Sequence, residues 1–116
     1  MYTSYFANLK NVSNPLSISG KAPEFYKGPQ FKVLAPKYGF FMDYKNGKID
    51  EAGYVENFYE LVLKPLDPAE LYAKLTTTYG DDVTLLCYER PGDFCHRRIV
   101  ADWFEQNLGI EVPELR

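Results

Sequence analysis

The sequence predicts a small α/β domain in which helices flank a mostly parallel β-sheet. Patterns typical of helices and of strands alternate along the second half of the chain, an order that favours parallel strands. Residues 83–88 form a continuous apolar run, as in strands that are buried on both faces. The chain of 116 residues is 46% hydrophobic and 25% charged, values typical of a globular protein. We therefore expect one domain that spans residues 1–116.

Two short strands are expected near the N-terminus. The apolar and aromatic residues at positions 2–7 predict a buried first strand. Asn14 and Pro15 interrupt this pattern, since both residue types favour turns. Residues 16–19 predict a second short strand, which ends at Gly20.

Residues 20–40 show no regular period, and lysines there alternate with aromatic residues. This pattern suits a phosphate backbone with stacked bases, which would make the segment a nucleic-acid contact. It also suits a surface loop whose rings pack on the core while the lysines stay in water, and we favour this second interpretation. The residues concerned are Lys21, Phe25, Tyr26, Lys27, Phe31, Lys32, Lys37 and Tyr38.

Three helices are expected before the buried strand. Residues 37–45 predict a short helix, and residues 50–63 predict an amphipathic helix that Pro65 ends. The third helix lies between Asp67 and Gly80, and both of its ends carry capping signals. Asp67 can accept hydrogen bonds at its start, and Gly80 allows a left-handed exit at its end.

The buried strand is followed by a loop and a last helix. Apolar side chains from Ile99 to Leu108 mark this helix, and Gly109 closes it. Asp93 is the expected N-cap. Residues 110–112 predict a short final strand.

The loop before the last helix carries most of the chemically reactive side chains. Ligands of open α/β sheets bind beyond the carboxyl ends of strands, and this loop follows such an end. With Asp93 as cap, Cys95, His96 and Arg97 fall in the first helical turn. The free N–H groups and the helix dipole of that turn favour an anion and lower the pKa of a cysteine.

We therefore predict a site at this turn. Cys95 would be a reactive thiol, His96 a second catalytic group and Glu89 an acid–base group, while Arg97 and Arg98 would bind an anion. Other interpretations stay open. Glu89 could instead form an ion pair with Arg97, Arg98 could be solvated, and Cys87, which lies in the apolar strand, could be a small core residue.

Several familiar sites do not fit the residues. Cys87, Cys95 and His96 would offer three metal ligands, but the adjacent Cys95 and His96 would have to turn toward one ion. We therefore predict neither a metal nor a cofactor. Ten residues separate Cys87 from Arg97, whereas the loop of a cysteine phosphatase needs six, and the Gly-Lys-Ser/Thr of a Walker loop is absent.

The segment from Leu85 to Phe104, LLCYERPGDFCHRRIVADWF, resembles the C-terminal signature of domain-of-unknown-function family 488. Members of that family carry C-x-E, a short loop and then C-H-R before a helix. The opening TSYFANLK is similar to that of the short members found in phage and bacterial genomes. The resemblance supports the fold and the site, and it implies no particular activity.

The charge distribution leaves the partner open. Residues 1–48 hold seven lysines and two acidic residues, whereas residues 49–116 hold six basic and fourteen acidic residues. Such a split can mark an anionic ligand, or it can mean that a basic layer packs beside an acidic one. We expect an enzyme or enzyme-like protein that binds a phosphorylated or nucleotide-like anion. The alternatives are a non-catalytic nucleic-acid-binding module and a purely structural C-H-R motif.

We expect a reducing, cytoplasmic setting with both cysteines as thiols. Two cysteines are too few for a disulfide scaffold, and the N-terminus lacks the pattern of a signal peptide. No segment reaches the roughly 20 apolar residues that span a bilayer, so we expect no membrane partner.

Overall fold

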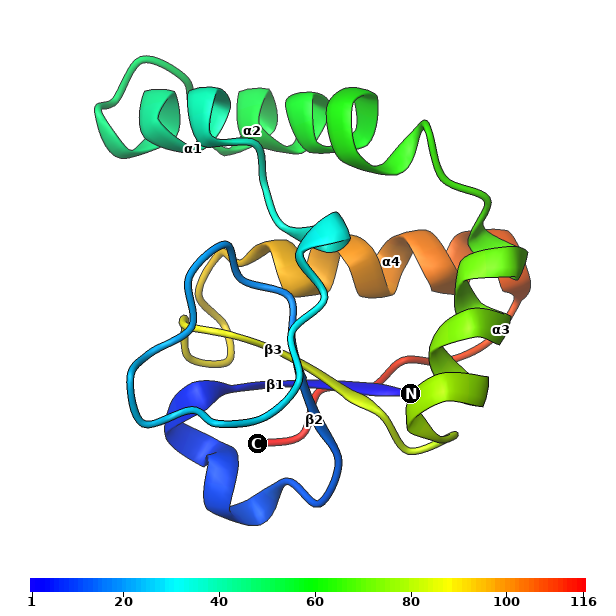
Figure 1. The fold of residues 1–116 in the computed structure, drawn as a ribbon. Coiled ribbons are helices and arrows are strands. Elements are labelled where there is room, and N and C mark those ends of the chain that lie inside the picture. Colours follow the sequence, from blue (N-terminus) through cyan, green and yellow to red (C-terminus); the bar gives the residue numbers. More distant parts are fainter.

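The computed structural model describes all residues from 1 to 116, and its centre is a three-stranded parallel sheet. Strands β1 (Tyr2–Tyr5) and β2 (Pro15–Ser17) both pair with β3 (Thr84–Cys87), which lies between them (Figure 1). Leu85 of β3 is opposite Thr3 of β1. Every residue of the central strand is buried, as its apolar sequence predicts. The predicted α/β fold with a parallel sheet is confirmed.

Four α-helices lie on one side of the sheet. They are α1 (Tyr38–Lys45), α2 (Glu51–Phe58), α3 (Pro68–Tyr79) and α4 (His96–Leu108). A π-helical turn, Tyr59–Leu63, continues α2. Figure 1 shows α4 between the sheet and the α1–α2 pair, with α3 beside one end of α4. None of these helices is long and apolar enough to cross a membrane.

Capping side chains fix two of the helix starts. Asp67 accepts a hydrogen bond of 3.0 Å from the backbone N–H of Glu70, which confirms the predicted start of α3. Asp50 accepts one of 2.8 Å from Gly53 at the start of α2. Such caps stabilise a helix by about 1 kcal/mol each, because they satisfy N–H groups that have no partner within the helix.

The sheet has apolar clusters on both faces. Leu85 belongs to the main core, which the sheet forms with α2, α3 and α4. Leu86 points to the other face and packs with Phe6, Val12 and Tyr26. Alternation along β3 therefore places Leu85 and Cys87 on the face that α4 covers. This orientation brings Cys87 to the predicted site.

Two predictions about strands are wrong. The first strand stops at Tyr5, and residues 6–11 form a 3-10 helix instead. Residues 110–112 form no strand. Hydrogen bonds to side chains hold this segment in place, and it pairs with no neighbouring strand. The N–H of Val112 donates to Glu105, and its carbonyl accepts from Arg98. Only a single bridge, between Thr3 and Glu114, joins the C-terminal segment to the sheet.

The lysine-rich segment 20–40 follows the surface-loop interpretation in part. All four of its lysines are exposed, and Tyr26 is buried with its hydroxyl donating to Pro29. Two rings do not pack on the core, since Phe25 is 61% and Tyr38 is 76% exposed. Tyr38 and Lys21 instead line a pocket beyond the carboxyl end of β3.

Candidate functional site

The loop between β3 and α4 turns sharply before the helix begins. Asp93 donates its N–H to the carbonyl of Arg90, and Gly92 has a φ of +90°, a value that favours glycine. The helix starts at His96, so Cys95 is the N-cap and Asp93 is not. The prediction of Asp93 as cap is therefore wrong. Asp93 belongs to the turn at residues 90–93, and the helix begins only after that turn.

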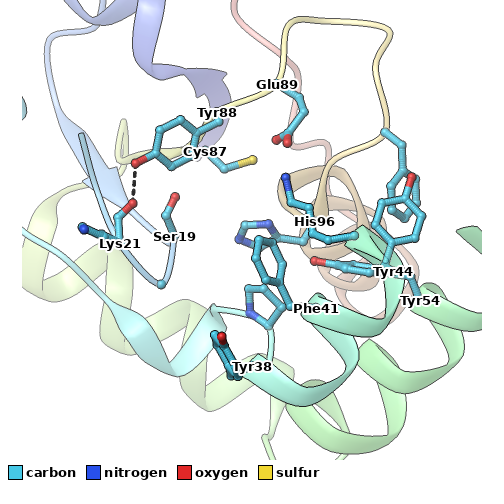
Figure 2. Close-up of a pocket in the computed structure, with 14 residues that line it drawn as sticks. Ser19, Lys21, Tyr38, Phe41, Tyr44, Tyr54, Cys87, Tyr88, Glu89 and His96 are labelled. Atoms are coloured by element: carbon cyan, nitrogen blue, oxygen red, sulfur yellow. Dashed lines mark hydrogen bonds between the residues drawn. The ribbon is translucent and has the colours of Figure 1, made fainter. Parts of the chain in front are cut away.

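A pocket of about 690 Å³ opens beyond the carboxyl end of β3. Six aromatic side chains line it, together with two lysines, one glutamate, one cysteine and one histidine (Figure 2). The walls come from β3 and its loop, from α1 and α2, from the first residue of α4 and from the segment after β2. The lining residues are Ser19, Gly20, Lys21, Pro36, Tyr38, Phe41, Tyr44, Lys45, Tyr54, Cys87, Tyr88, Glu89, Phe94 and His96.

Ser19 contributes the one buried side-chain polar atom without a partner. Its residue is only 4% exposed, and its Oγ has no hydrogen bond. Buried polar groups are nearly always paired, and an unpaired one costs about 1–3 kcal/mol. Since Ser19 lines the pocket, a bound molecule with a polar atom could satisfy this hydroxyl.

The two cysteines form a disulfide, Cys87–Cys95. The prediction of two free thiols is therefore wrong for this structure. Cys87 points from β3 toward the start of α4. Cys95 lies there in an extended conformation, with φ −152° and ψ 143°. Both sulfurs are buried, but Cys87 also lines the pocket, so it is more than the core residue that its strand position suggested.

His96 is buried, and its ring orientation is fixed by the backbone. Its Nε2 lies 2.8 Å from the carbonyl oxygen of Ile18, which can only accept, so Nε2 carries the proton. Nδ1 is then unprotonated and lies 4.0 Å from Cys95 Sγ. Burial, and secondarily the charge of Arg97, lowers the pKa of His96 to about 4, although the bond to Ile18 works in the opposite direction. The imidazole is therefore neutral at pH 7.

Arg97 binds the C-terminal segment. It is 1% exposed, its Nε and Nη2 donate to the carboxylate of Glu114 at 2.9 and 2.6 Å, and its Nη1 donates to Cys87 Sγ at 3.2 Å. Burial raises the pKa of Glu114, but the hydrogen bonds from Arg97 and Thr3 outweigh it and hold that pKa below its usual value. All of its side-chain nitrogens have partners within the protein, so no donor of Arg97 is free for the predicted anion in this structure.

Arg98 is also engaged within the fold. Its Nη1 donates to Thr3 Oγ1 at 2.9 Å and to the carbonyl of Val112 at 2.8 Å. These bonds tie α4 to β1 and to the C-terminal segment. Arg98 is half-buried and does not line the pocket beyond β3, so its Nη1 has a structural role there.

Glu89 lies at the pocket and does not pair with Arg97. This outcome removes the ion-pair interpretation of Glu89. Its charge acts on Tyr54, whose pKa is raised first by burial and then by Glu89 and Tyr44. Tyr54 therefore stays protonated and can donate a hydrogen bond in the pocket. Figure 2 shows Glu89, Cys87 and His96 around the same pocket.

The model of the DUF488-N3a family, described as the active DUF488-N3 subclade, matches residues 12–108. The chain belongs to this family. The assignment confirms the resemblance seen in the C-x-E and C-H-R residues. No curated protein and no solved structure matches this DUF488-N3 chain.

The family match covers all residues that line the pocket, but not Glu114, the partner of Arg97. All lining residues of this DUF488-N3 chain, from Ser19 to His96, lie within residues 12–108, whereas Glu114 lies outside. Reasoning from sequence missed Ser19, Tyr54 and Glu114. A signal existed for Cys87, because it ends the buried strand, and ligands of open α/β sheets bind beyond such ends. No local signal pointed to Glu114, which is 17 residues from its partner.

Acid is expected to destabilise this DUF488-N3 chain through His96. Its pKa is about 4 in the folded protein and about 6.5 when unfolded, so the unfolded chain binds the proton more readily. The resulting stability is fully present above about pH 6.5 and is lost as the pH falls toward 4. We expect a loss of about 3 kcal/mol in the free energy of unfolding by pH 4. Urea unfolding at several pH values measures it.

The matched control is His96→Asn, which removes the titrating ring. Carboxylates such as Glu114 are present in both proteins, so the difference between the two pH profiles isolates His96. Parallel profiles between pH 6.5 and 4 would contradict the buried, neutral histidine.

Proposed function

We propose that this chain is an enzyme or enzyme-like protein that binds a nucleotide-like small molecule in the pocket beyond β3. The observation that carries the proposal is the composition of this pocket. Six aromatic rings surround a few polar groups, as in sites that hold a planar ligand and orient it by a small number of contacts. The unpaired Ser19 hydroxyl adds a polar group that only a ligand or a water molecule can satisfy.

The charges at the pocket support an anionic ligand. Lys21 and Lys45 are exposed and both line it, so they can meet a phosphate group without the cost of leaving water. Both lysines come from the basic N-terminal half of the chain, whereas Glu89 comes from the acidic half. The ligand would therefore bind with its phosphate toward the lysines and its reacting end toward Glu89.

The reacting groups of the proposal are Glu89, Cys95 and His96. Glu89 would act as the acid–base group, because its carboxylate borders the pocket. Cys95 does not itself line the pocket but lies behind Cys87, which does, and it would act as a thiol after reduction of the disulfide, with Nδ1 of His96 beside its sulfur. A cytoplasmic setting, which we propose, supplies such a reductant: a dithiol gives two electrons and two protons and itself becomes a disulfide.

Binding of nucleoside monophosphates tests the proposal. Isothermal titration calorimetry with AMP, GMP, CMP and UMP is expected to show one site, and the matching nucleosides are expected to bind more weakly. The double variant Lys21→Ala/Lys45→Ala should weaken the best binder about tenfold, which corresponds to about 1.4 kcal/mol. Higher salt should reduce the difference in nucleotide affinity between the wild type and this variant, because exposed charges are screened.

The control is Lys10→Ala/Lys27→Ala, which removes the same charge from exposed lysines that do not line the pocket. Ser19→Ala is a second test. It should weaken nucleotide binding several-fold and leave the free energy of unfolding unchanged or higher, because the hydroxyl has no partner in the protein. Absence of binding by all four nucleotides, or equal losses in the two lysine variants, would contradict the proposal.

A nucleic-acid-binding module is the second candidate, and one observation favours it. Phe25 and Tyr38 are exposed rings in the lysine-rich segment, an arrangement that suits stacked bases. A short single-stranded oligonucleotide in the same titration separates the two functions. Binding that depends on Phe25 and falls steeply with salt would support this candidate over a small-molecule site.

A further inference from the structure

We propose that the reduced form of the Cys87–Cys95 pair, together with His96, binds one zinc ion. The three ligand atoms, two Sγ atoms and one histidine nitrogen, all lie within 4.8 Å of one another. All three residues are buried. Tetrahedral zinc sites use this combination of thiolates and imidazole. This inference does not depend on which molecule the pocket binds, but with zinc bound Cys95 and His96 would be its ligands, and Glu89 alone would remain as the acid–base group.

The backbone conformation of Cys95 allows its side chain and that of His96 to converge, which the sequence did not suggest. Adjacent side chains on one helix point in different directions, so Cys95 and His96 were not expected to share an ion. Cys95, however, is extended, and the helix begins only at His96. This change of conformation between neighbours lets both side chains face Cys87, as their distances show.

The tautomer of His96 also suits a metal ligand. Its Nε2–H donates to the carbonyl of Ile18, which leaves the lone pair of Nδ1 free on the side of Cys95. Histidines that bind metals commonly donate their other ring N–H to a backbone carbonyl in this way, because the bond fixes the ring. Zinc binding would therefore need no change of tautomer at His96.

The surroundings of Cys87 favour a thiolate. Nη1 of Arg97 donates to its sulfur, and a nearby guanidinium stabilises the charged form that binds metal. The two Cα atoms are 7.3 Å apart, beyond the range of about 4.4–6.8 Å that most disulfides span. The backbone therefore leaves room for two separated sulfurs with an ion between them.

Three protein ligands would leave a fourth position open. Cys87 and His96 both line the pocket, so this position would face the proposed ligand. Zinc sites with three protein ligands and one open position are typical of catalysis, whereas structural sites are closed by a fourth ligand. A zinc ion held there would polarise an oxygen atom of a substrate.

The chemistry balances with a named reductant. A phosphine such as TCEP reduces the disulfide to two thiols, with two protons and an oxygen atom taken from water, and becomes a phosphine oxide. Zinc then replaces the two thiol protons, which are released to the buffer. Oxidised protein has no thiolates to offer and should bind no zinc.

Zinc titration of the full chain in the presence of TCEP tests the proposal. Competition with a chromophoric chelator and native mass spectrometry should give one zinc per chain with a Kd tighter than about 1 µM. Oxidised protein should give none. Cobalt in place of zinc should produce a thiolate charge-transfer band, a signature that needs no variant. Binding of zinc by the oxidised form, or no tight binding by the reduced form, overturns the proposal.

Variants separate this cluster from other zinc sites. Cys87→Ser, Cys95→Ser and His96→Asn are each expected to weaken zinc binding at least a hundredfold, whereas Asp93→Asn, an exposed acid in the same loop, should not. Circular dichroism confirms folding of each variant. If a cysteine variant binds zinc as tightly as the wild type, the ion is elsewhere and the proposal fails. Nucleotide titrations in EDTA keep the pocket proposal testable on its own.

Discussion

Replacing Arg97 with methionine is expected to lower the free energy of unfolding by about 3–5 kcal/mol. The guanidinium is 1% exposed and holds Glu114, whose side chain is 11% exposed, through two short hydrogen bonds. Its loss leaves a carboxylate in a largely buried position without its partner. Urea denaturation of the wild type and of Arg97→Met measures the difference at neutral pH.

The matched control for Arg97→Met is the surface pair of Lys64 and Glu60, whose side chains are 71% and 62% exposed. Lys64→Ala should change stability by less than about 0.5 kcal/mol, because water screens exposed charges. Adding Glu114→Gln to Arg97→Met should recover part of the loss. If Arg97→Met is as stable as the wild type but loses nucleotide affinity, Arg97 is a ligand-binding residue after all.

Phe58→Ala is expected to cost about 3–5 kcal/mol, as for other large aromatic residues in a protein core. Phe58 is fully buried, and its ring centre is 6.2 Å from that of Tyr54 and 5.7 Å from that of His96. It thus supports two residues that line the pocket. Thermal and urea unfolding give the stability change, and calorimetry should show weaker nucleotide binding even where the variant is folded.

Phe25→Ala is the control for Phe58→Ala, since Phe25 is the same residue type but 61% exposed. Its free energy of unfolding should match that of the wild type within about 0.5 kcal/mol. A Phe58→Ala protein that keeps wild-type stability would mean that the cavity collapses without cost, and it would contradict the packing between α2 and α4.

The parts of the fold that local physics determines were predictable. The apolar run of β3 indicated a central strand, and Asp67 marked the start of α3 through its side chain. The start of α4 was not predictable in the same way, because Cys95 caps it without a side-chain bond. Residues 110–112 resemble a strand in composition, but Arg98 and Glu105 hold that segment through side chains.

The position of the pocket was predictable, and the residues that line it only in part. The end of β3 before a helix indicated a site, and Glu89 and His96 do line the pocket. The role of Arg97 depends on Glu114, a contact between distant residues that no motif reveals. Tyr44 and Tyr54 fit the apolar pattern of helices, and that pattern cannot distinguish a core residue from one that lines a pocket.

The cysteines show why spacing alone cannot decide whether three such side chains converge. Neighbouring side chains diverge when both residues are helical, so Cys95 and His96 did not suggest one site. The extended conformation of Cys95 changes their relative orientation, and the loop of residues 88–94 brings Cys87 back to them. Whether two adjacent residues can converge is decided by where the helix begins, which depends on the loop before it.

The central claim is that the pocket beyond β3 binds a nucleotide-like ligand, and an NMR titration tests it most directly. Addition of the best-binding nucleoside monophosphate to ¹⁵N-labelled protein should shift the backbone amide signals of Ser19, Tyr44, Tyr54, Glu89 and His96, which all line the pocket. Shifts confined to the exposed surface around Phe25 and Val33, or no shifts with any of the four nucleotides, would contradict it.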